Sequence, residues 1–280
     1  MQISGTTRIV GLIADPIGQV RTPQLLNSIF AEHGVDAVAI GLHVGVDGLT
    51  EAWRGLARLQ NLAGFVVSIP HKPDAAGLCD ALGPSAAQAG TVNAVRREAD
   101  GRLVGETFDG TGFVAGLQAE GMAIAGRRVL LLGSGGAAAS IAFALAGSGA
   151  AAIEIVNRTP AKAAGLAERL GRAYPHLAVS TASSAGPGAD LIVNATSLGL
   201  APDDPLPVDP AVIGSGACVA EALIAASPSA LGRAAMARGA RHLDGRPMLN
   251  GQVMLLLRHI LPESFPAAAI ALAPAAARSA

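Results

Sequence analysis

The sequence predicts an α/β protein with two domains: an N-terminal, mostly parallel α/β domain and a C-terminal, Rossmann-like doubly wound domain. Three observations support this prediction. The chain has 280 residues, and a domain takes roughly 150. Short apolar runs alternate with helical segments along it. A glycine cluster over 133–136 follows one such run and precedes an Ala-rich segment, the order found at nucleotide sites of doubly wound sheets.

The first 107 residues alternate between strand and helix patterns. The apolar run at 8–14 predicts a buried strand that stops at Asp15-Pro16. Thr22 as N-cap and Pro23 in the first turn predict a helix to about Glu32. The remaining patterns predict strands over 36–44, 62–69, 91–98 and 102–106, and helices over about 48–60 and 73–81.

The rest of the chain repeats this rhythm. A helix is expected over about 109–119, and the small-residue stretch 120–126 is the candidate domain boundary. A strand at 128–132 leads into the glycine cluster and a helix that ends near Ser148. The Ala/Pro-rich tail from Pro262 on is expected to pack loosely. The other patterns predict strands at 152–156, 177–181 and 190–195, and helices at 160–171, about 227–238 and about 248–260.

Composition excludes several classes of protein. Hydrophobic residues make up 51% and charged residues 15%, enough apolar mass for sizeable cores, and aromatics are only 3%. A net charge of −1 without a basic run argues against a nucleic-acid partner. No apolar run is long enough for a membrane span, and the start of the chain lacks a secretory core. Two cysteines far apart in sequence fit a reduced, cytoplasmic protein.

The glycine cluster indicates a phosphate site. Glycine allows a tight turn and lets backbone N–H groups approach a phosphate at a helix N-terminus. A glycine turn without a ligand is the alternative, and the flanking strand and helix patterns favour binding. The residues concerned are Gly133, Ser134, Gly135, Gly136 and Ala137.

The next strand predicts NADP rather than NAD. NAD sites usually carry an acidic residue at the end of this strand, but here Val156 is followed by Asn157, Arg158 and Thr159, with Lys162 close behind. Arg158 and Lys162 suit a 2′-phosphate; the alternative is an exposed pair on a solvated helix. A later strand ends in the polar run Asn194–Ser197, which includes Thr196 and is expected at the ligand edge of the sheet.

Short motifs occur in a fixed order along the chain. They are Gly11–Ile17, Ser68–Lys72, Ala89–Asn93, Asp109–Gly112, Gly133–Ala137, Asn157–Thr159, Asn194–Ser197, and Gly245–Leu249 with Gln252. As an ordered set they resemble the shikimate dehydrogenase family, over nearly the whole chain to about residue 260. The resemblance implies reversible, NADP-linked oxidation of a ring hydroxyl to a ketone, which interconverts shikimate and 3-dehydroshikimate.

The resemblance implies that Lys72 and Asp109 form the catalytic acid/base pair. The chemistry agrees, because a hydroxyl that loses a hydride from its carbon must also lose its proton to a base. Lysine can exchange that proton, whereas arginine stays protonated. The chain has 20 basic residues but only two lysines, Lys72 and Lys162, so a retained lysine suggests a local need. A surface lysine and a helix N-cap are the alternatives for Lys72 and Asp109. Whether Lys72 acts as base or mainly as proton donor stays open.

The resemblance also implies the remaining contacts. Asn93 and Gln252 match positions that hydrogen-bond the substrate, although a turn residue and a helix-surface residue are alternatives. Met248 and Leu249, after Gly245, match a stretch near the nicotinamide. We therefore expect a substrate domain over 1–107, completed by helices at about 248–280, a cofactor domain over 108–247, and an active site in the cleft between them. The other positions matching the substrate pocket are Val20, Thr22, Ser68 and Thr107.

Four positions depart from the family pattern on the substrate side. Val20, Val66, Phe108 and Ile224 stand where the family usually has polar groups. Each lost partner costs about 1–3 kcal/mol, which puts shikimate in competition with quinate or another cyclic hydroxy acid. Arg21 or Gln19 is a candidate for holding a substrate carboxylate. A non-catalytic NADP sensor is the alternative of another class. We expect a small cyclic hydroxy-carboxylate as partner, no metal, and a monomer or homodimer.

Overall fold

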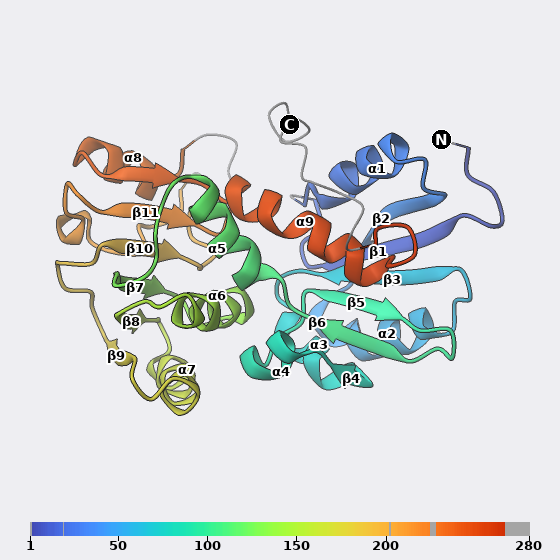
Figure 1. Cartoon of the computed structure of the whole chain (residues 1–280), viewed down its shortest axis with the longest axis horizontal. Helices are drawn as coiled ribbons and strands as arrows, with labels where there is room; N and C mark the ends of the chain where they lie inside the picture. Colours follow the sequence, from blue (N-terminus) through green and yellow to red (C-terminus); the bar gives the residue numbers. More distant parts are fainter. Residues whose placement is uncertain (1, 19, 202, 225–227, 267–280) are drawn as a thin grey trace. The chain divides into compact units, whose positions relative to one another are not determined.

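The computed structural model describes residues 2–18, 20–201, 203–224 and 228–266, and the chain forms two compact units. Unit 1 comprises Met1–Phe108 and the segment from Val253 on, and unit 2 comprises Asp109–Gln252. Within these described residues each unit is built on a six-stranded sheet, so the predicted α/β fold with two mostly parallel sheets is confirmed. The chain re-enters unit 1 inside one helix, α9 (Arg246–Ile260) (Figure 1).

The sheet of unit 1 has the strand order β2-β1-β3-β5-β6-β4. β1 is parallel to β2 and β3, and β4 is parallel to β6, whereas β5 is antiparallel to both β3 and β6. The carboxyl ends of β1, β3 and β6 therefore meet the amino end of β5 at one edge. The strands are β1 (Arg8–Ala14), β2 (Ala37–His43), β3 (Leu62–Val67), β4 (Ala81–Leu82), β5 (Ala94–Arg97) and β6 (Leu103–Glu106).

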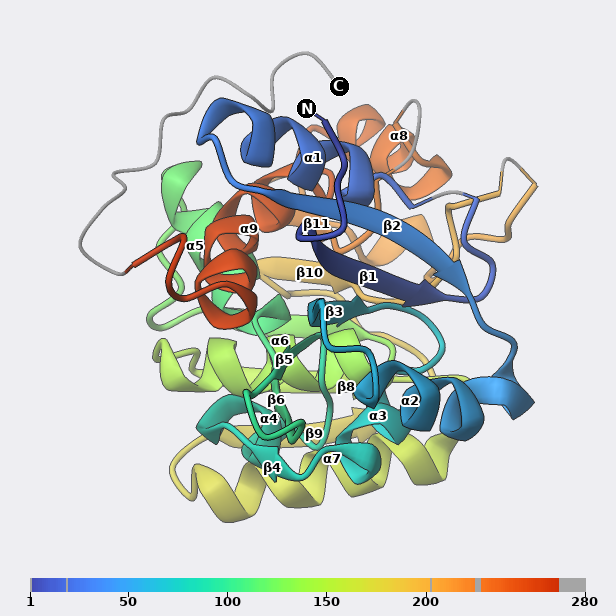
Figure 2. The same ribbon diagram turned by 90° about the vertical axis from the view of Figure 1, so that its right-hand side faces the viewer.

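Alternate residues of these strands feed two apolar cores. On one face, Leu12 packs with Phe30 and Leu257 under α1 and α9. On the other face, Ile13 packs with Trp53 under α2, α3 and α4. Figure 2 shows α1 above β1 and β2, and α2 and α3 below them. The helices are α1 (Thr22–Glu32), α2 (Leu49–Ala57), which follows the 3-10 turn η1 (Val46–Gly48), α3 (Lys72–Leu78) and α4 (Pro84–Ala89).

The sheet of unit 2 has the order β12-β11-β10-β7-β8-β9, and every pairing is parallel (Figure 1). The order reverses between β7 and β10, the point at which open α/β sheets bind ligands. The strands are β7 (Arg128–Leu132), β8 (Ala152–Val156), β9 (Ala178–Ala182), β10 (Leu191–Asn194), β11 (Cys218–Glu221) and β12 (Arg241–Leu243).

Helices cover both faces of this sheet. Leu130, Ile192 and Val219 point to the face covered by η2 (Pro210–Val212) and α8 (Ala230–Ala237). Unit 2 also contains α5 (Asp109–Ala119), α6 (Gly136–Gly147), α7 (Pro160–Ala173) and the first part of α9, and α6 packs closely against α5. This alternation of strand and helix is the predicted doubly wound arrangement.

Several local predictions were wrong. The tail from Pro262 on was expected to pack loosely, but Phe265 is fully buried, with its ring 6.4 Å from that of Phe30. The tail beyond residue 266 lies outside the described residues. Thr22 is the first helical residue of α1 rather than its N-cap, and Arg21 occupies the cap position without a side-chain hydrogen bond. The short elements β4, α4, β11 and β12 were not predicted.

None of the described helices combines the length and apolar character that a bilayer span requires. In the described part of the chain, no three His, Cys, Asp or Glu side chains gather as metal ligands would.

Candidate active site

The glycine turn after β7 has the shape of a phosphate cradle. Gly133 has a φ of +107°, and a Cβ on it would lie 3.0 Å from the carbonyl oxygen of Ala195. Gly135 is the N-cap of α6, and the space where its Cβ would stand is open to 4 Å. The buried Ser134 Oγ has no hydrogen-bond partner among the described residues. An orphaned hydroxyl beside an open glycine fits a pyrophosphate, so the predicted NADP contacts suit this turn.

Gly136 and Ala137 form the first turn of α6. The backbone N–H groups of a first helical turn have no partner within the helix, and the helix dipole adds partial positive charge there. The helical hydrogen bonds of α6 begin at Ala139, whose N–H donates to Gly135 O at 2.9 Å. The amides before it are the groups that a phosphate at the turn would use.

The end of β8 lies beside the glycine turn, because Gly133 N–H donates to Val156 O at 2.8 Å. Asn157 Nδ2 donates to Thr159 O at 3.0 Å and so fixes the bend into α7. Arg158 lies two residues before α7 and Lys162 lies in its first turn; both side chains are exposed. Two exposed cations in the turn and helix after the second strand suit a ribose 2′-phosphate.

Two further segments follow the strands on the other side of the switch point. Asn194 is fully buried at the end of β10, and its Oδ1 accepts hydrogen bonds from Thr196 N at 3.1 Å and Thr196 Oγ1 at 2.7 Å. Ser197, the next residue, is exposed. Gly245 follows β12, and its N–H donates to Leu223 O at 2.8 Å. Met248 is buried and Leu249 half-buried in the first turn of α9.

Asp109 is the first residue of α5 and is 1% exposed. The next amide, Gly110 N–H, donates to Ser140 Oγ of α6 at 2.8 Å. On another side of α5, Gly112 lies against Gln252 of α9, where a Cβ would come 2.5 Å from that of Gln252. Close packing against α6 and α9 therefore fixes the start of α5 within unit 2. Two residues predicted to serve the site, Asp109 and Gln252, lie in these packed segments.

Unit 1 brings several of the residues predicted to serve the substrate together at one edge of its sheet. Ser68 follows β3, and its N–H donates to Ile13 O at 2.8 Å. Lys72 is half-buried at the start of α3, and its carbonyl accepts from Val92 N at 3.0 Å. Asn93 is 2% exposed, and its Oδ1 accepts from Phe108 N at 2.9 Å. These bonds hold the backbones of segments 68–72, 92–93 and 107–108 side by side.

Neighbouring buried groups stabilise this edge. Thr107 is 1% exposed, and its N–H donates to Glu106 Oε1 at 2.8 Å. The same carboxylate accepts from Ala86 N at 2.6 Å and thereby caps α4. His71, directly before Lys72, is buried, and its Nε2–H donates to Val44 O at 2.7 Å. Sequence reasoning missed His71 and Glu106, because their partners lie at least 20 residues away in sequence.

Three of the four departures from the family pattern belong to one apolar cluster of unit 1. Val66 is 6% exposed, and Val20 and Phe108 are half-buried against the same core. The Phe108 ring makes an edge contact with His259, at 5.8 Å between centroids. Burial lowers the pKa of His259, although its Nε2–H donates to Val104 O. Phe108 therefore packs against a neutral ring, which extends the apolar surface.

The remaining substrate-side predictions fall on other segments of the chain. Thr22 is half-buried at the start of α1, and Arg21 beside it is exposed. Gln19, the other candidate for holding a carboxylate, lies outside the described residues. Ile224 belongs to unit 2, where its Cγ1 would lie 3.0 Å from a Cβ on Gly245.

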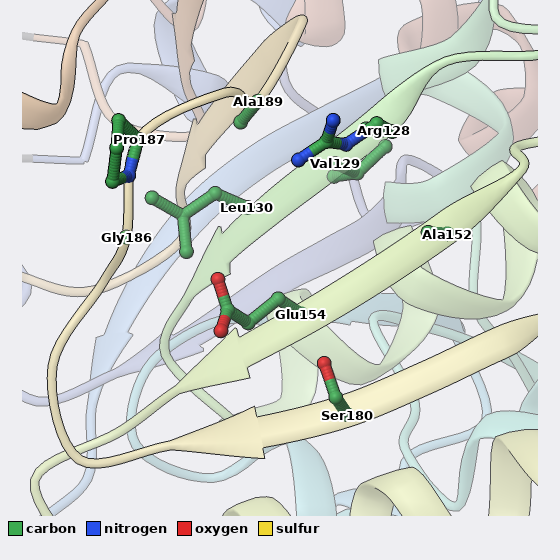
Figure 3. Close-up of a pocket in the computed structure, with 9 residues that line it drawn as sticks. All are labelled: Arg128, Val129, Leu130, Ala152, Glu154, Ser180, Gly186, Pro187 and Ala189. Atoms are coloured by element: carbon green, nitrogen blue, oxygen red, sulfur yellow. The ribbon is translucent and has the colours of Figure 1, made fainter.

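A cavity of about 200 Å³ lies elsewhere in unit 2. Figure 3 shows Gly186 and Pro187 facing β7 and β8 across this hollow. Arg128 and Ala152, which line it, are the first residues of their strands. The predicted cofactor residues follow the opposite, carboxyl ends of these strands. The hollow is therefore separate from the candidate site.

Fold and site together define a class: an α/β protein with a doubly wound unit whose glycine turn, and whose basic residues after the second strand, suit NADP. The N-terminal part matches the family model "Shikimate dehydrogenase substrate binding domain" over residues 12–95. Residues 117–200 match "Shikimate / quinate 5-dehydrogenase". A relative from Rubrobacter xylanophilus named shikimate dehydrogenase (NADP(+)) is 40% identical over 252 residues, 89% of this chain and 88% of the relative. The chain belongs to the shikimate dehydrogenase family.

Solved structures agree on the fold. Shikimate dehydrogenase from Thermus thermophilus, in complex with NADP(H) and shikimate, is 25% identical with a TM-score of 0.83, over 96% of this chain and 97% of that one. The 5-ketofructose reductase of a Gluconobacter strain, in a ligand-free form, is 32% identical with a TM-score of 0.79, over 91% and 93%.

Proposed function

We propose that this chain is an NADP-dependent dehydrogenase that interconverts shikimate and 3-dehydroshikimate. The observation that carries the proposal is the 40% identity to a shikimate dehydrogenase (NADP(+)) over most of both chains. The open glycine turn with its orphaned Ser134 hydroxyl supports the cofactor, and the polar edge of unit 1 supports a hydroxylated substrate.

We assign acid/base chemistry to Lys72 and Asp109. NADP, when bound, accepts or supplies the hydride. When the hydroxyl is oxidised its proton passes to Lys72 Nζ, and when the ketone is reduced Lys72 returns a proton to the carbonyl oxygen. Asp109 orients the ammonium group and balances its charge. Hydrogen bonds of unit 1 support this pairing, because they bring Phe108, the neighbour of Asp109 in the chain, close to the backbone of residues 92–93 and Lys72.

Contacts to the substrate are assigned to Ser68, Asn93, Thr107, Thr22 and Gln252. Their hydroxyl and amide groups suit ring hydroxyls, and Asn93 and Thr107 are almost fully buried. The proposal assigns the 2′-phosphate to Arg158 and Lys162, the pyrophosphate to the glycine turn, and the nicotinamide side to the segments around Thr196 and Met248.

Substitution of Lys72 tests the chemistry. Purified protein with NADP⁺ and shikimate should show growth of reduced-nicotinamide absorbance. Lys72→Ala and Lys72→Arg should both abolish turnover while NADPH binding persists, because arginine keeps the charge but does not release the proton. A Lys72→Arg enzyme that turns over at the wild-type rate would remove Lys72 from proton transfer.

Substitution of Arg158 tests the cofactor assignment. Arg158→Ala should weaken NADPH binding by about 10–150-fold, the value of a charge-assisted hydrogen bond of ~1.5–3 kcal/mol, and leave NADH binding unchanged. Arg172→Ala is a matched control, because Arg172 is an exposed cation in the last turn of α7, the helix that follows Arg158. Equal losses for NADPH and NADH would refute the 2′-phosphate assignment.

A second candidate substrate class is an uncharged polyhydroxy ketone. The similarity to 5-ketofructose reductase and the apolar cluster of Val20, Val66 and Phe108 favour it. A carboxylate placed against this cluster would lose hydration without gaining partners, whereas a neutral hydroxyketone would lose less. The rates of shikimate and quinate oxidation with NADP⁺, measured beside the rate of 5-ketofructose reduction with NADPH, decide between the candidates. NADPH binding without turnover of any of them would instead favour the sensor alternative.

A cytoplasmic location, a monomeric or homodimeric state, and the absence of nucleic-acid partners stay predictions. Size-exclusion chromatography with light scattering measures the oligomeric state directly.

A further inference from the structure

A buried carboxylate links the ends of β10 and β11 to β12. Glu221, the last residue of β11, is 1% exposed. Its Oε1 accepts a hydrogen bond from Asn194 Nδ2 at 2.9 Å. Its Oε2 accepts from Ser229 Oγ at 2.6 Å and from His242 Nε2 at 2.8 Å. The three donors come from the end of β10, the N-cap of α8 and the middle of β12.

These hydrogen bonds keep the carboxylate ionised. Burial opposes ionisation, but the bonds from His242, Ser229 and Asn194 outweigh it and hold the pKa of Glu221 below its usual value. An ionised carboxylate only accepts hydrogen bonds, so it dictates which atom of the Asn194 amide faces it.

Asn194 passes this orientation to the loop 194–199. With Nδ2 on Glu221, Nδ2 also donates to Leu198 O at 3.0 Å, and Oδ1 accepts both bonds from Thr196. Thr196 Oγ1 in turn accepts from Leu198 N at 3.1 Å. If the amide rotated by half a turn, Nδ2 would face the Thr196 amide, and these bonds would be lost. The carboxylate therefore selects the one amide orientation that closes the loop.

The loop adjoins the glycine turn. Ala195 N–H donates to Leu132 O at 2.9 Å, and the Ala195 carbonyl oxygen lies 3.0 Å from where a Cβ of Gly133 would stand. A shift of this loop would therefore move the backbone of the glycine turn, which is proposed to bind the cofactor.

His242 completes the support. Its ring lies on Gly232, where a Cβ would come 2.5 Å from His242 Cε1, and Gly232 N–H donates to Ser229 Oγ at 2.9 Å. The imidazole is thus fixed between α8 and Glu221, and it directs its Nε2–H to the carboxylate.

We propose that Glu221 and His242 are positioning residues that hold loop 194–199 in the conformation in which Thr196 and Ser197 contact NADP. The inference rests on the proposed function, since it takes NADP as the ligand. Neither residue touches the cofactor in this proposal; both act through Asn194.

The main experiment measures NADPH dissociation by fluorescence titration, beside thermal unfolding of each variant. Glu221→Met keeps the length of the side chain but removes the acceptor from Asn194, and should weaken NADPH binding about tenfold. Ile213→Val is the matched control, because Ile213 is fully buried in the core beside α8 and makes no side-chain polar contact. It should lower the melting temperature without changing NADPH affinity.

A polarity exchange tests the link between Glu221 and Asn194 directly. Asn194→Asp has the same shape, but it sets an oxygen against Glu221 Oε1 and Leu198 O, and should weaken NADPH binding about tenfold. Adding Glu221→Gln restores one hydrogen bond with donor and acceptor exchanged, since the glutamine amide donates to Asp and its oxygen accepts from Ser229 and His242. The double variant should therefore bind NADPH about threefold or more tightly than Asn194→Asp alone.

Two results would overturn the proposal: a folded Glu221→Met protein with wild-type NADPH affinity, or a double variant that binds no better than Asn194→Asp. If Glu221→Met does not fold, the polarity exchange still decides. Wild-type protein that fails to bind NADPH would overturn the proposed function, and this inference with it. If the wild-type protein binds NADPH and the variants bind it with the same affinity, this inference alone is overturned.

Discussion

Gly135→Ala separates the binding role of the glycine turn from its folding role. Gly135 has φ −74° and ψ −173°, a conformation that alanine adopts, and no heavy atom lies within 4 Å of the added Cβ. A compatible Gly→Ala change gains about 0.4–1 kcal/mol from the unfolded state, and a poorer N-cap costs a similar amount. The free energy of unfolding should therefore stay within ~1 kcal/mol of wild type.

The same methyl group should block the cofactor. The open space over Gly135 is where a phosphate would approach the amides of the first turn of α6. The loss of one charge-assisted hydrogen bond of about 1.5–3 kcal/mol corresponds to a 10–150-fold weaker NADPH affinity.

Gly133→Ala provides the contrast. Its φ of +107° is unfavourable for alanine, at about 1–3 kcal/mol, and its Cβ would lie 3.0 Å from Ala195 O. This variant should lose both stability and NADPH affinity. Urea unfolding and NADPH titration of both variants check the reasoning. A Gly135→Ala protein that binds NADPH like wild type would refute it, as would one whose loss of affinity accompanies an equal loss of stability.

Three further predictions concern stability and reactivity. Phe265→Ala should lower the free energy of unfolding, measured with urea, by about 3–5 kcal/mol, because the ring is fully buried. Met236→Ala should change this free energy little, because Met236 is half-exposed. Equal effects of the two substitutions would mean that Phe265 lies in a loosely packed tail. The pKa of Glu221 is lowered in the folded protein, so the ionised carboxylate stabilises the fold above its ordinary pKa of 4.5, and this stabilisation is lost as pH falls through the lowered pKa. The acid unfolding curves of wild type and Glu221→Gln should therefore converge at low pH. Parallel curves would contradict this. Burial raises the pKa of Cys79 to about 12 and that of Cys218 to about 11, so neither thiol should react with a disulfide reagent at pH 8 until urea unfolds the chain; rapid labelling of native protein would refute it.

Regular elements with strong apolar patterns could be predicted from the sequence, whereas very short ones could not. Strand 152–156 was predicted with the bounds that the structure has, since five apolar-rich residues lie between turn signals. β4 has two residues and β12 three, too few to show a period. Phe265 was misjudged because one aromatic residue is hidden in the average composition of its segment, although it alone contributes a large buried area.

Local motifs located the candidate site, but its supports were not visible in the sequence. Gly133–Ala137 and Arg158 lie at strand ends, where the pattern of apolar runs already placed them. Glu221 binds Asn194 and His242, which are 27 and 21 residues away in sequence, and only the sheet order brings them together. A carboxylate that ends an apolar strand was the available signal, since a charge there needs partners.

Family membership constrains the identity of the substrate less than any other feature. The packing explains why single substitutions back to the polar residues of the family will not identify the substrate. Val66 is 6% exposed and shares one apolar cluster with Val20 and Phe108. A lone Val66→Asn change would bury an amide among apolar neighbours, at a cost of about 1–3 kcal/mol, whatever the substrate. Changes within one cluster are not additive, so a polar pocket must be restored at all three positions together. A triple variant that gains shikimate turnover where each single variant loses it would show that the apolar cluster, rather than any one residue, sets the specificity.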